Sequence, residues 1–170
     1  MPILEEEDRM VKNLTIVLAM GALFVCNLQA AMVSFMVIET GLNEDDKKQE
    51  HTLQWENNLL DVFFEAGHIV CNSPVIRLDK KPSGELPKEA KSEFLEAADV
   101  GIEYFIVAQL DYTAGSKEPS EISLRMYKMI PSPYKKILEK KLEGKIYRTA
   151  SEETDELKKI ARDLIPLISN

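Results

Sequence analysis

A run of 26 residues without a charged side chain, from Asn13 to Ile38, constrains this chain more than any other feature of its sequence. The run is long enough to cross a bilayer as one helix, which needs about 20 apolar residues. Its character changes at Asn27 and Gln29, where polar side chains interrupt the apolar stretch before the small pair Ala30-Ala31. A short apolar core followed by small residues is the layout of a signal peptide and its cleavage site. We therefore predict that residues 1–30 are an export signal and that residues 31–170 form the mature protein.

The very start of the chain fits an export signal poorly, because MPILEEED carries four acidic residues where such signals are positively charged. Translation from Met10 would remove this segment and leave Lys12 ahead of the apolar core. Two other outcomes stay open. In the first, Cys26 carries a lipid, because it follows Leu23-Phe24-Val25, a partial match to a lipoprotein signal. In the second, the segment is not cleaved and anchors the chain in the membrane. All three outcomes place the mature domain outside the cytoplasm, in the periplasm or at the outer membrane of a bacterium.

The composition of the chain narrows the possible partners. The 170 residues carry a net charge of -8, from 29 acidic and 21 basic residues, and the basic pairs are short and flanked by acids. A surface of this sign repels the phosphate backbone, so we expect no nucleic-acid binding. Removal of residues 1–30 takes away four acidic and two basic residues and leaves a net charge of -6. We expect membrane association only through the amino-terminal segment, if it is uncleaved or lipidated.

Residues 31–170 predict one α/β domain with a single mixed sheet. The segment Ala31–Ile38 is apolar on both alternating faces, which is typical of a strand in the middle of a sheet covered by helices. We predict about five strands and three helices in the order β-α-β-α-β-β-β-α, with early parallel crossovers and a late antiparallel meander. The further elements are a helix over about 44–66, a strand at 68–71, a helix from 87 to 101, strands at 102–112, 121–130 and 135–147, and a helix from about 149. Residues 75–78 are an additional short strand candidate.

The first of these helices has a predicted core stripe of large apolar residues, and Gly67 ends it. Trp55 falls at the edge of the stripe, which consists of Leu53, Leu59, Leu60, Phe63 and Phe64.

Few residues suggest chemistry. His51 lies on the polar face of the first helix and is predicted to be a surface residue. His68 and Cys71 are three residues apart in a strand, so their side chains point to opposite faces, and we interpret Cys71 as a small buried residue. Three acids that could be paired, Asp111, Glu118 and Glu121, fall in or beside a polar loop. We therefore expect no catalytic residue, no cofactor and no metal site, and predict that the chain is not an enzyme.

Arg125 and Tyr127 are the best candidates for a contact surface. They alternate with Ile122, Leu124 and Met126, so they occupy the wetter face of their strand. Arginine and tyrosine are favoured at protein interfaces. The structural alternative is that the carboxy-terminal helix covers both side chains.

The order of elements resembles a group of bacterial envelope domains. Its most specific part is Ala98-Asp99-Val100-Gly101 leading into Tyr104-Phe105-Ile106-Val107, after a long helix that ends in GHIV. The group includes the amino-terminal domain of TolB, activator lipoproteins of penicillin-binding proteins, flagellar outer-membrane accessory proteins and curli-secretion proteins of the CsgG type. The resemblance implies a non-enzymatic domain that binds another envelope protein through an exposed sheet edge or loop.

Two functional hypotheses follow. The first is an extracytoplasmic protein-interaction or assembly module, which an exposed apolar patch or an uncovered strand edge at 136–147 would favour. The second is a periplasmic protein that binds a small ligand or glycan fragment between the loops at 72–86 and 111–121. A closed apolar pocket of several hundred cubic ångströms would favour that second hypothesis.

The signal-peptide hypothesis makes a direct prediction about the mature protein. Amino-terminal sequencing of the exported protein should begin at Ala31 or Met32, because the cut follows the small residues. Recovery of an intact Met1 from the envelope fraction would rule out both the cleavage and the internal start.

Overall fold

The computed structural model describes residues 30–41, 50–82, 84, 86–113, 116, 118–144 and 147–168. The predicted export signal, the internal start at Met10 and the lipidation candidate Cys26 lie outside these ranges and stay predictions. Among the helices in these ranges, none is long and apolar enough to span a membrane.

The domain is built on one mixed sheet of six strands, which confirms the predicted α/β class. Strand β1 is parallel to β2, β3 and β4, whereas β4, β5 and β6 form an antiparallel meander. The sheet has one strand more than the five predicted, because two short strands, β2 and β3, pair one after the other with the same edge of β1. The strands are β1 (Met32–Thr40), β2 (Ile69–Asn72), β3 (Ile76–Leu78), β4 (Tyr104–Tyr112), β5 (Pro119–Lys128) and β6 (Lys135–Glu143).

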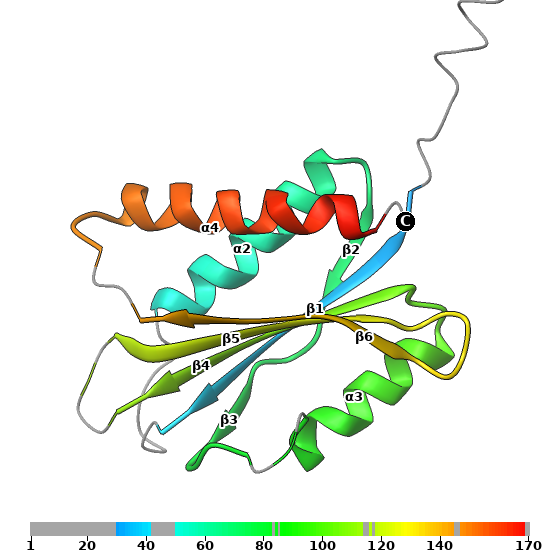
Figure 1. Cartoon of the computed structure of the whole chain (residues 1–170), viewed down its shortest axis with the longest axis horizontal. Helices are drawn as coiled ribbons and strands as arrows, with labels where there is room; N and C mark the ends of the chain where they lie inside the picture. The colour runs from blue at the N-terminus through cyan, green and yellow to red at the C-terminus, as the bar shows by residue number, and fades with distance from the viewer. Residues whose placement is uncertain are drawn as a thin grey trace, which may run out of the picture.

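Helices cover both faces of the sheet. Figure 1 shows α2 (Glu50–Glu65) and α4 (Ala150–Leu164) on one face and α3 (Lys88–Asp99) on the other. The two faces hold separate apolar cores, one beneath α2 and α4 and a smaller one beneath α3. Every residue of β4, and every residue of β1 except Met32, is buried. The apolar pattern at 31–38 therefore correctly predicted a central strand.

The ends of the helices follow the local sequence. Gly67 and Gly101, with φ of 86° and 87°, adopt the left-handed conformation that glycine tolerates just after α2 and α3. Thr149 caps α4, where its hydroxyl oxygen accepts a hydrogen bond of 3.1 Å from the Glu152 amide. A short 3₁₀ turn, η1 (Ile165–Leu167), carries Pro166 and follows α4.

The predicted core stripe of α2 was partly wrong. Trp55 is buried at its centre, whereas Leu53 and Phe64 are 42% and 70% exposed. At 3.6 residues per turn, positions 53 and 64 lie about 0.4 of a turn away from the mean direction of the buried residues, so they face away from the sheet. The buried apolar residues of this helix are Trp55, Leu59, Val62 and Phe63. The predicted start of the helix near residue 44 lies outside the described ranges.

Two adjacent phenylalanines test the orientation of α2. Phe63 is fully buried and packs edge-to-face on Phe35 of β1, with ring centroids 5.2 Å apart. Phe63→Ala should lower the free energy of unfolding by about 3–5 kcal/mol because it opens a cavity in the core. Phe64→Ala is the matched control and should change it by about 0.5 kcal/mol or less. Urea unfolding measures both values, and equal losses would contradict this orientation.

Candidate functional site

Arg125 and Tyr127 point from β5 toward the α3 side of the sheet. Both are buried, with 4% and 0% of their surface exposed, so the expectation of a wetter face was wrong. The face is covered by α3 and not by the carboxy-terminal helix, because Tyr127 belongs to the core beneath α3. Neither side chain presents an open surface in this structure. Contact of a partner with Arg125 or Tyr127 stays a prediction.

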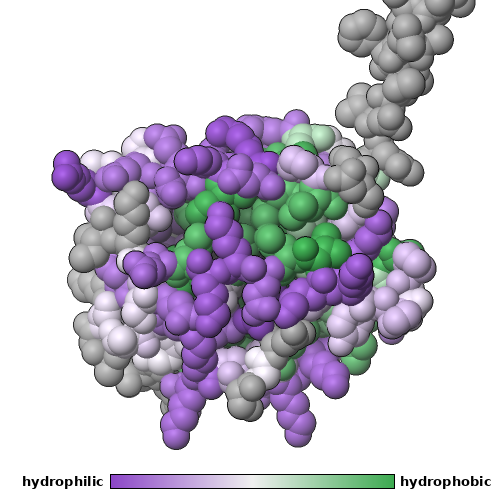
Figure 2. All heavy atoms as spheres, in the orientation of Figure 1, coloured by the Kyte–Doolittle hydropathy of each residue, from purple (hydrophilic) through white to green (hydrophobic). Residues whose placement is uncertain are grey.

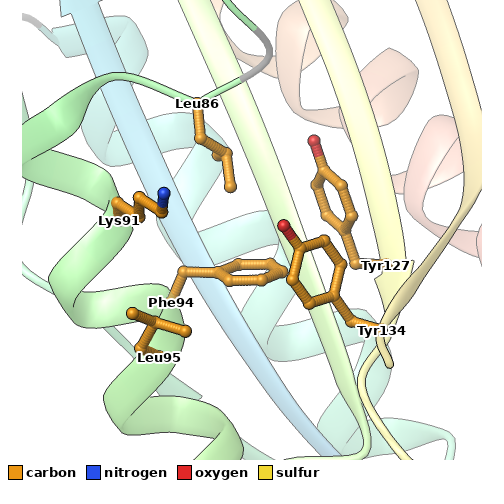
Figure 3. Close-up of a pocket in the computed structure, with 6 residues that line it drawn as sticks. All are labelled: Leu86, Lys91, Phe94, Leu95, Tyr127 and Tyr134. Atoms are coloured by element: carbon orange, nitrogen blue, oxygen red, sulfur yellow. The ribbon is translucent and has the colours of Figure 1, made fainter. Parts of the chain in front are cut away.

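Tyr127 forms one wall of a small aromatic pocket under α3. Phe94 of α3 packs edge-to-face on both Tyr127 and Tyr134, with ring centroids 5.1 Å and 4.6 Å away. Figure 3 shows the two tyrosine hydroxyls pointing the same way, with the Lys91 amine and Leu86 beside them. The pocket holds about 150 Å³. Ligand sites commonly measure about 300–1,000 Å³, so this one is small for a ligand of that kind.

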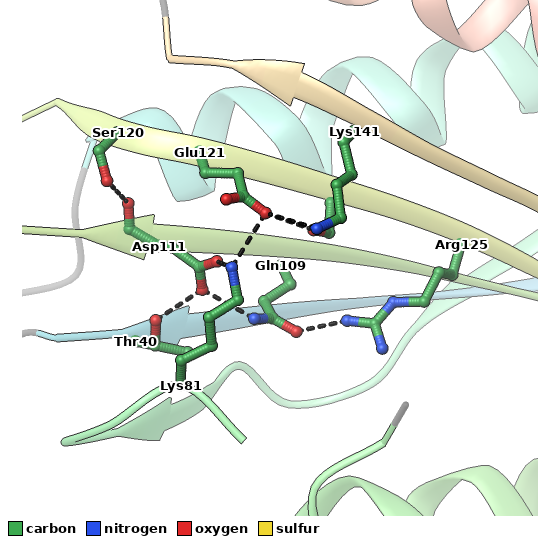
Figure 4. A network of polar contacts seen from close by, with 9 residues as sticks. Thr40, Lys81, Gln109, Asp111, Ser120, Glu121, Arg125 and Lys141 are labelled. Carbon is green, nitrogen blue, oxygen red and sulfur yellow. Dashed lines mark hydrogen bonds and ion pairs between the residues drawn. The ribbon is translucent and has the colours of Figure 1, made fainter. Parts of the chain in front are cut away.

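A polar network lies on the same side of the sheet, where β1 and β4 end (Figure 4). The Asp111 carboxylate accepts hydrogen bonds from Thr40 Oγ1 and Gln109 Nε2, each at 2.7 Å, and forms an ion pair of 2.6 Å with Lys81 Nζ. Arg125 donates in turn to Gln109 Oε1. Burial alone would raise the pKa of Asp111, but the hydrogen bonds from Gln109, Lys81 and Thr40 outweigh it and lower the pKa below its usual value.

Lys81 connects this network to β5. Its ammonium lies 2.9 Å from the Glu121 carboxylate, which also faces Lys141 at 3.4 Å. Hydrogen bonds to Asp111 and Glu121 raise the pKa of Lys81. The ammonium therefore fills space between the segments at 72–86 and 111–121, where the ligand-binding hypothesis placed its site. An acid with a lowered pKa stays ionised at neutral pH, so this arrangement favours a structural role over proton transfer.

Sequence reasoning singled out Asp111, Glu121 and Arg125 but did not predict that they share a network, although one signal was present. Gln109 and Asp111 are polar residues two positions apart in a strand that is otherwise apolar, which places them on one face. A buried polar pair in such a strand requires partners. Lys81 comes from a loop about 30 residues earlier, and nothing in the local pattern indicates that contact.

A second polar cluster lies on the opposite face, beneath α2 and α4. Glu39 of β1 is fully buried, and its carboxylate accepts from Arg77 Nε at 2.7 Å and from the Thr52 hydroxyl. His51 is half-buried instead of lying on the surface as predicted. Its Nε2 lies 2.7 Å from Glu118 and its Nδ1 lies 2.6 Å from Glu153, so it joins α2 to α4 and to the start of β5.

The predicted burial of Cys71 was wrong, whereas the neighbouring His68 is buried. His68 is buried, and its Nδ1 accepts a hydrogen bond of 3.3 Å from the Ala31 amide. Burial lowers the pKa of His68, with a smaller opposing effect of Glu103, because the charged imidazole is poorly solvated there. Cys71 is exposed, since β2 lies at the edge of the sheet. Within the described ranges, no group of three or more histidines, cysteines or acids is arranged to hold a metal ion.

The β6 strand forms the other edge of the sheet, as the Lys-rich pattern predicted. Within the described part of the chain it pairs only with β5. Leu138 and Leu142 pack from β6 against the α2/α4 core and are only partly buried. Figure 2 shows an apolar patch between α4 and β6, with hydrophilic side chains below it. The surface formed by the outer edge of β6 and this patch is called the β6 edge.

Comparison with known proteins gives a family and several distant structural likenesses. Residues 32–160 match the model of a family described as "Uncharacterised protein". No curated protein matches the chain.

Three solved structures of bacterial proteins are similar to the chain at low identity. A PelC dodecamer from Paraburkholderia phytofirmans is 16% identical with a TM-score of 0.40, over 83% of this chain and 89% of that one. TolB from Acinetobacter baumannii is 13% identical with a TM-score of 0.41, over 83% of this chain and 29% of TolB. The LpoB C-terminal domain from Escherichia coli is 12% identical with a TM-score of 0.39, over 74% of this chain and 90% of that one.

The Lys81 contacts predict a pH-dependent stability difference. Lys81→Met should lower the free energy of unfolding at pH 7 by about 1 kcal/mol, a modest value because the lysine is half exposed and water screens the pair. The lowered pKa of Asp111 contributes stability that is present above its unfolded value near 3.8 and is lost as the pH falls through the folded value. The difference between wild type and variant should therefore shrink in acid.

Urea unfolding at several pH values measures this effect, and Lys80→Met serves as the control because Lys80 is the exposed neighbour. An equal loss in both variants, or a loss that stays constant down to acid pH, would contradict the role given to Lys81.

Proposed function

We propose that this chain, which belongs to the family whose model matches residues 32–160, is a non-enzymatic interaction or assembly module of the bacterial envelope. It binds another envelope protein through the β6 edge. The partner is a protein, and the binding needs no cofactor.

The open edge of β6 is the observation that carries this proposal. An edge strand presents a row of backbone N–H and C=O groups that can pair with an added strand. The strand has nine residues, which is long enough for such pairing, and the apolar patch lies directly beside it. Main-chain hydrogen bonds then supply affinity, while side-chain contacts on each face supply specificity.

The alternative hypothesis of a small-ligand or glycan-binding protein has less support. The aromatic pocket measures about 150 Å³, well below the several hundred cubic ångströms that this hypothesis requires. Lys81 and its ion pairs with Asp111 and Glu121 fill part of the space between the two loops. These observations therefore favour the protein-interaction module over the ligand-binding protein.

The beginning of β1 is compatible with the proposed export. The Ile69 amide donates to the Ala31 carbonyl at 3.0 Å, so the hydrogen bonds of the described sheet extend to residue 31. A cut after Ala30 would remove no residue of that sheet. Export followed by folding of residues 31–170 would place the β6 edge in the periplasm or at the outer membrane.

Site-specific photocrosslinking tests the β6 edge as the binding surface. A photoreactive amino acid in place of Lys140 on β6 should give a protein adduct in envelope fractions, because a partner strand lies within reach. The same amino acid in place of Lys88 on α3 or Asp155 on α4 is the control. Both side chains are exposed; Lys88 lies on the helix that covers the opposite face of the sheet, and Asp155 lies on the side of α4 turned away from its buried residues.

An adduct from the α3 or α4 position with none from β6 would overturn the proposed surface. Specific retention of a small molecule by the purified protein, with no protein adduct from any position, would favour the ligand-binding alternative.

A further inference from the structure

The β6 strand is a basic strip on an acidic chain. It carries four lysines, at 135, 136, 140 and 141, and two glutamates, at 139 and 143, whereas the whole chain has a net charge of -8. Lys136 forms an ion pair of 2.6 Å with Glu139 within the strand. Lys141 lies 3.4 Å from Glu121 and is still 66% exposed at its side chain. The edge therefore has positive charge available for a partner.

The two faces of β6 differ in chemistry. Leu138, Lys140 and Leu142 lie opposite Met126, Leu124 and Ile122 of β5, which all belong to the α2/α4 core. These three β6 residues therefore share the α4 side of the sheet. Glu139 and Lys141 lie opposite Arg125 and Ser123, on the α3 side. Along the edge, the pattern from 138 to 142 is apolar, acidic, basic, basic, apolar.

We propose that the partner contributes an acidic extended segment that lies antiparallel to β6. Two apolar side chains, four positions apart, pack beside Leu138 and Leu142. Carboxylates between them lie opposite Lys140 and Lys141. This assignment rests on the proposed function, because it names the class of segment that the β6 edge binds.

Cross-strand geometry supports an antiparallel acidic strand. Side chains directly opposite each other in an antiparallel pair stand about 4.5–5.5 Å apart on the same face, so a glutamate reaches the lysine it faces. Antiparallel pairing is also slightly more stable per residue than parallel pairing. Opposite charges in such positions strengthen binding by about one and a half to fivefold per pair.

A second copy of this chain fits the edge less well. In an antiparallel pair of β6 strands centred on Lys140, Glu139 would face Lys141 of the other copy, but Lys140 would face Lys140, and the joined strips would hold eight lysines against four glutamates. Lysines on an edge strand discourage such self-pairing. In an acidic partner strand, by contrast, the added carboxylates would face the lysines of β6.

Peptide binding to the purified protein tests this inference by fluorescence anisotropy. The probe is a short labelled peptide with the core Leu-Glu-Glu-Thr-Leu, whose residues face Leu142, Lys141, Lys140, Glu139 and Leu138 in antiparallel register. A peptide with Leu-Gln-Gln-Thr-Leu isolates the effect of charge. The acidic peptide with N-methylated alternate amides isolates the effect of backbone pairing.

The acidic peptide should bind about two- to twenty-fivefold more tightly than the glutamine peptide, and N-methylation should abolish binding. The variant Lys140→Glu should weaken the acidic peptide about fivefold. Lys88→Glu on α3 carries the same charge change away from β6 and should leave binding unchanged, which separates local pairing from net charge.

The remaining outcomes separate the partner class from the proposed function. Equal binding of both peptides, sensitive to N-methylation, would overturn the acidic class and leave the edge function intact. Undiminished binding of the N-methylated peptide would overturn both. Failure of every peptide to bind, together with a β6 crosslink in the envelope, would overturn only the acidic segment. Concentration-dependent dimerisation that is lost in Lys141→Glu, which would put a like charge opposite Glu139 of the other copy, would identify a second copy as the occupant and overturn the acidic segment.

Discussion

Burial of β1 and β4 on both faces is the constraint on which the rest of the structure depends. The two strands pair in parallel over eight positions, from Val33 with Tyr104 to Thr40 with Asp111. A parallel pair with apolar side chains on both faces must be covered on both sides. This requirement places α2 and α4 on one face and α3 on the other, and it leaves function to the edges and the strand ends.

The two edges of the sheet are protected in different ways. On one side, the edge consists of the short strands β2 and β3, which are interrupted at Ser73-Pro74-Val75. On the other side, β6 is long, with a register shift at Ile137, and lysines mark its outward surface. Interruption and charge both discourage nonspecific pairing. The charged edge keeps a regular row of backbone groups from Leu138 to Glu143 for a chosen partner, so it is the better interaction surface.

Much of the fold could be predicted, whereas the polar contacts could not. The apolar run at 31–38, the lysine-rich edge and the glycines after α2 and α3 are local signals, and the structure confirms each of them. The stripe of α2 was misplaced because helical periodicity defines a face only to within about one residue. Lys81, Asp111 and Glu121 meet because parallel strand ends and their loops converge in space, which no local pattern shows. The alternation in β5 correctly placed Arg125 and Tyr127 on one face of the strand, but their burial depended on the position of α3.

The sequence by itself determined the order of elements, the central position of the first strand and the charged character of β6. Local periodicity and turn chemistry control these features, since neighbouring residues encode them. Only the tertiary structure decided which helix covers which face, that Lys81 ties two distant segments together, and that an apolar patch lies between α4 and β6. Those features depend on contacts between residues far apart in the chain, which form when burial of the two central strand faces brings the layers together.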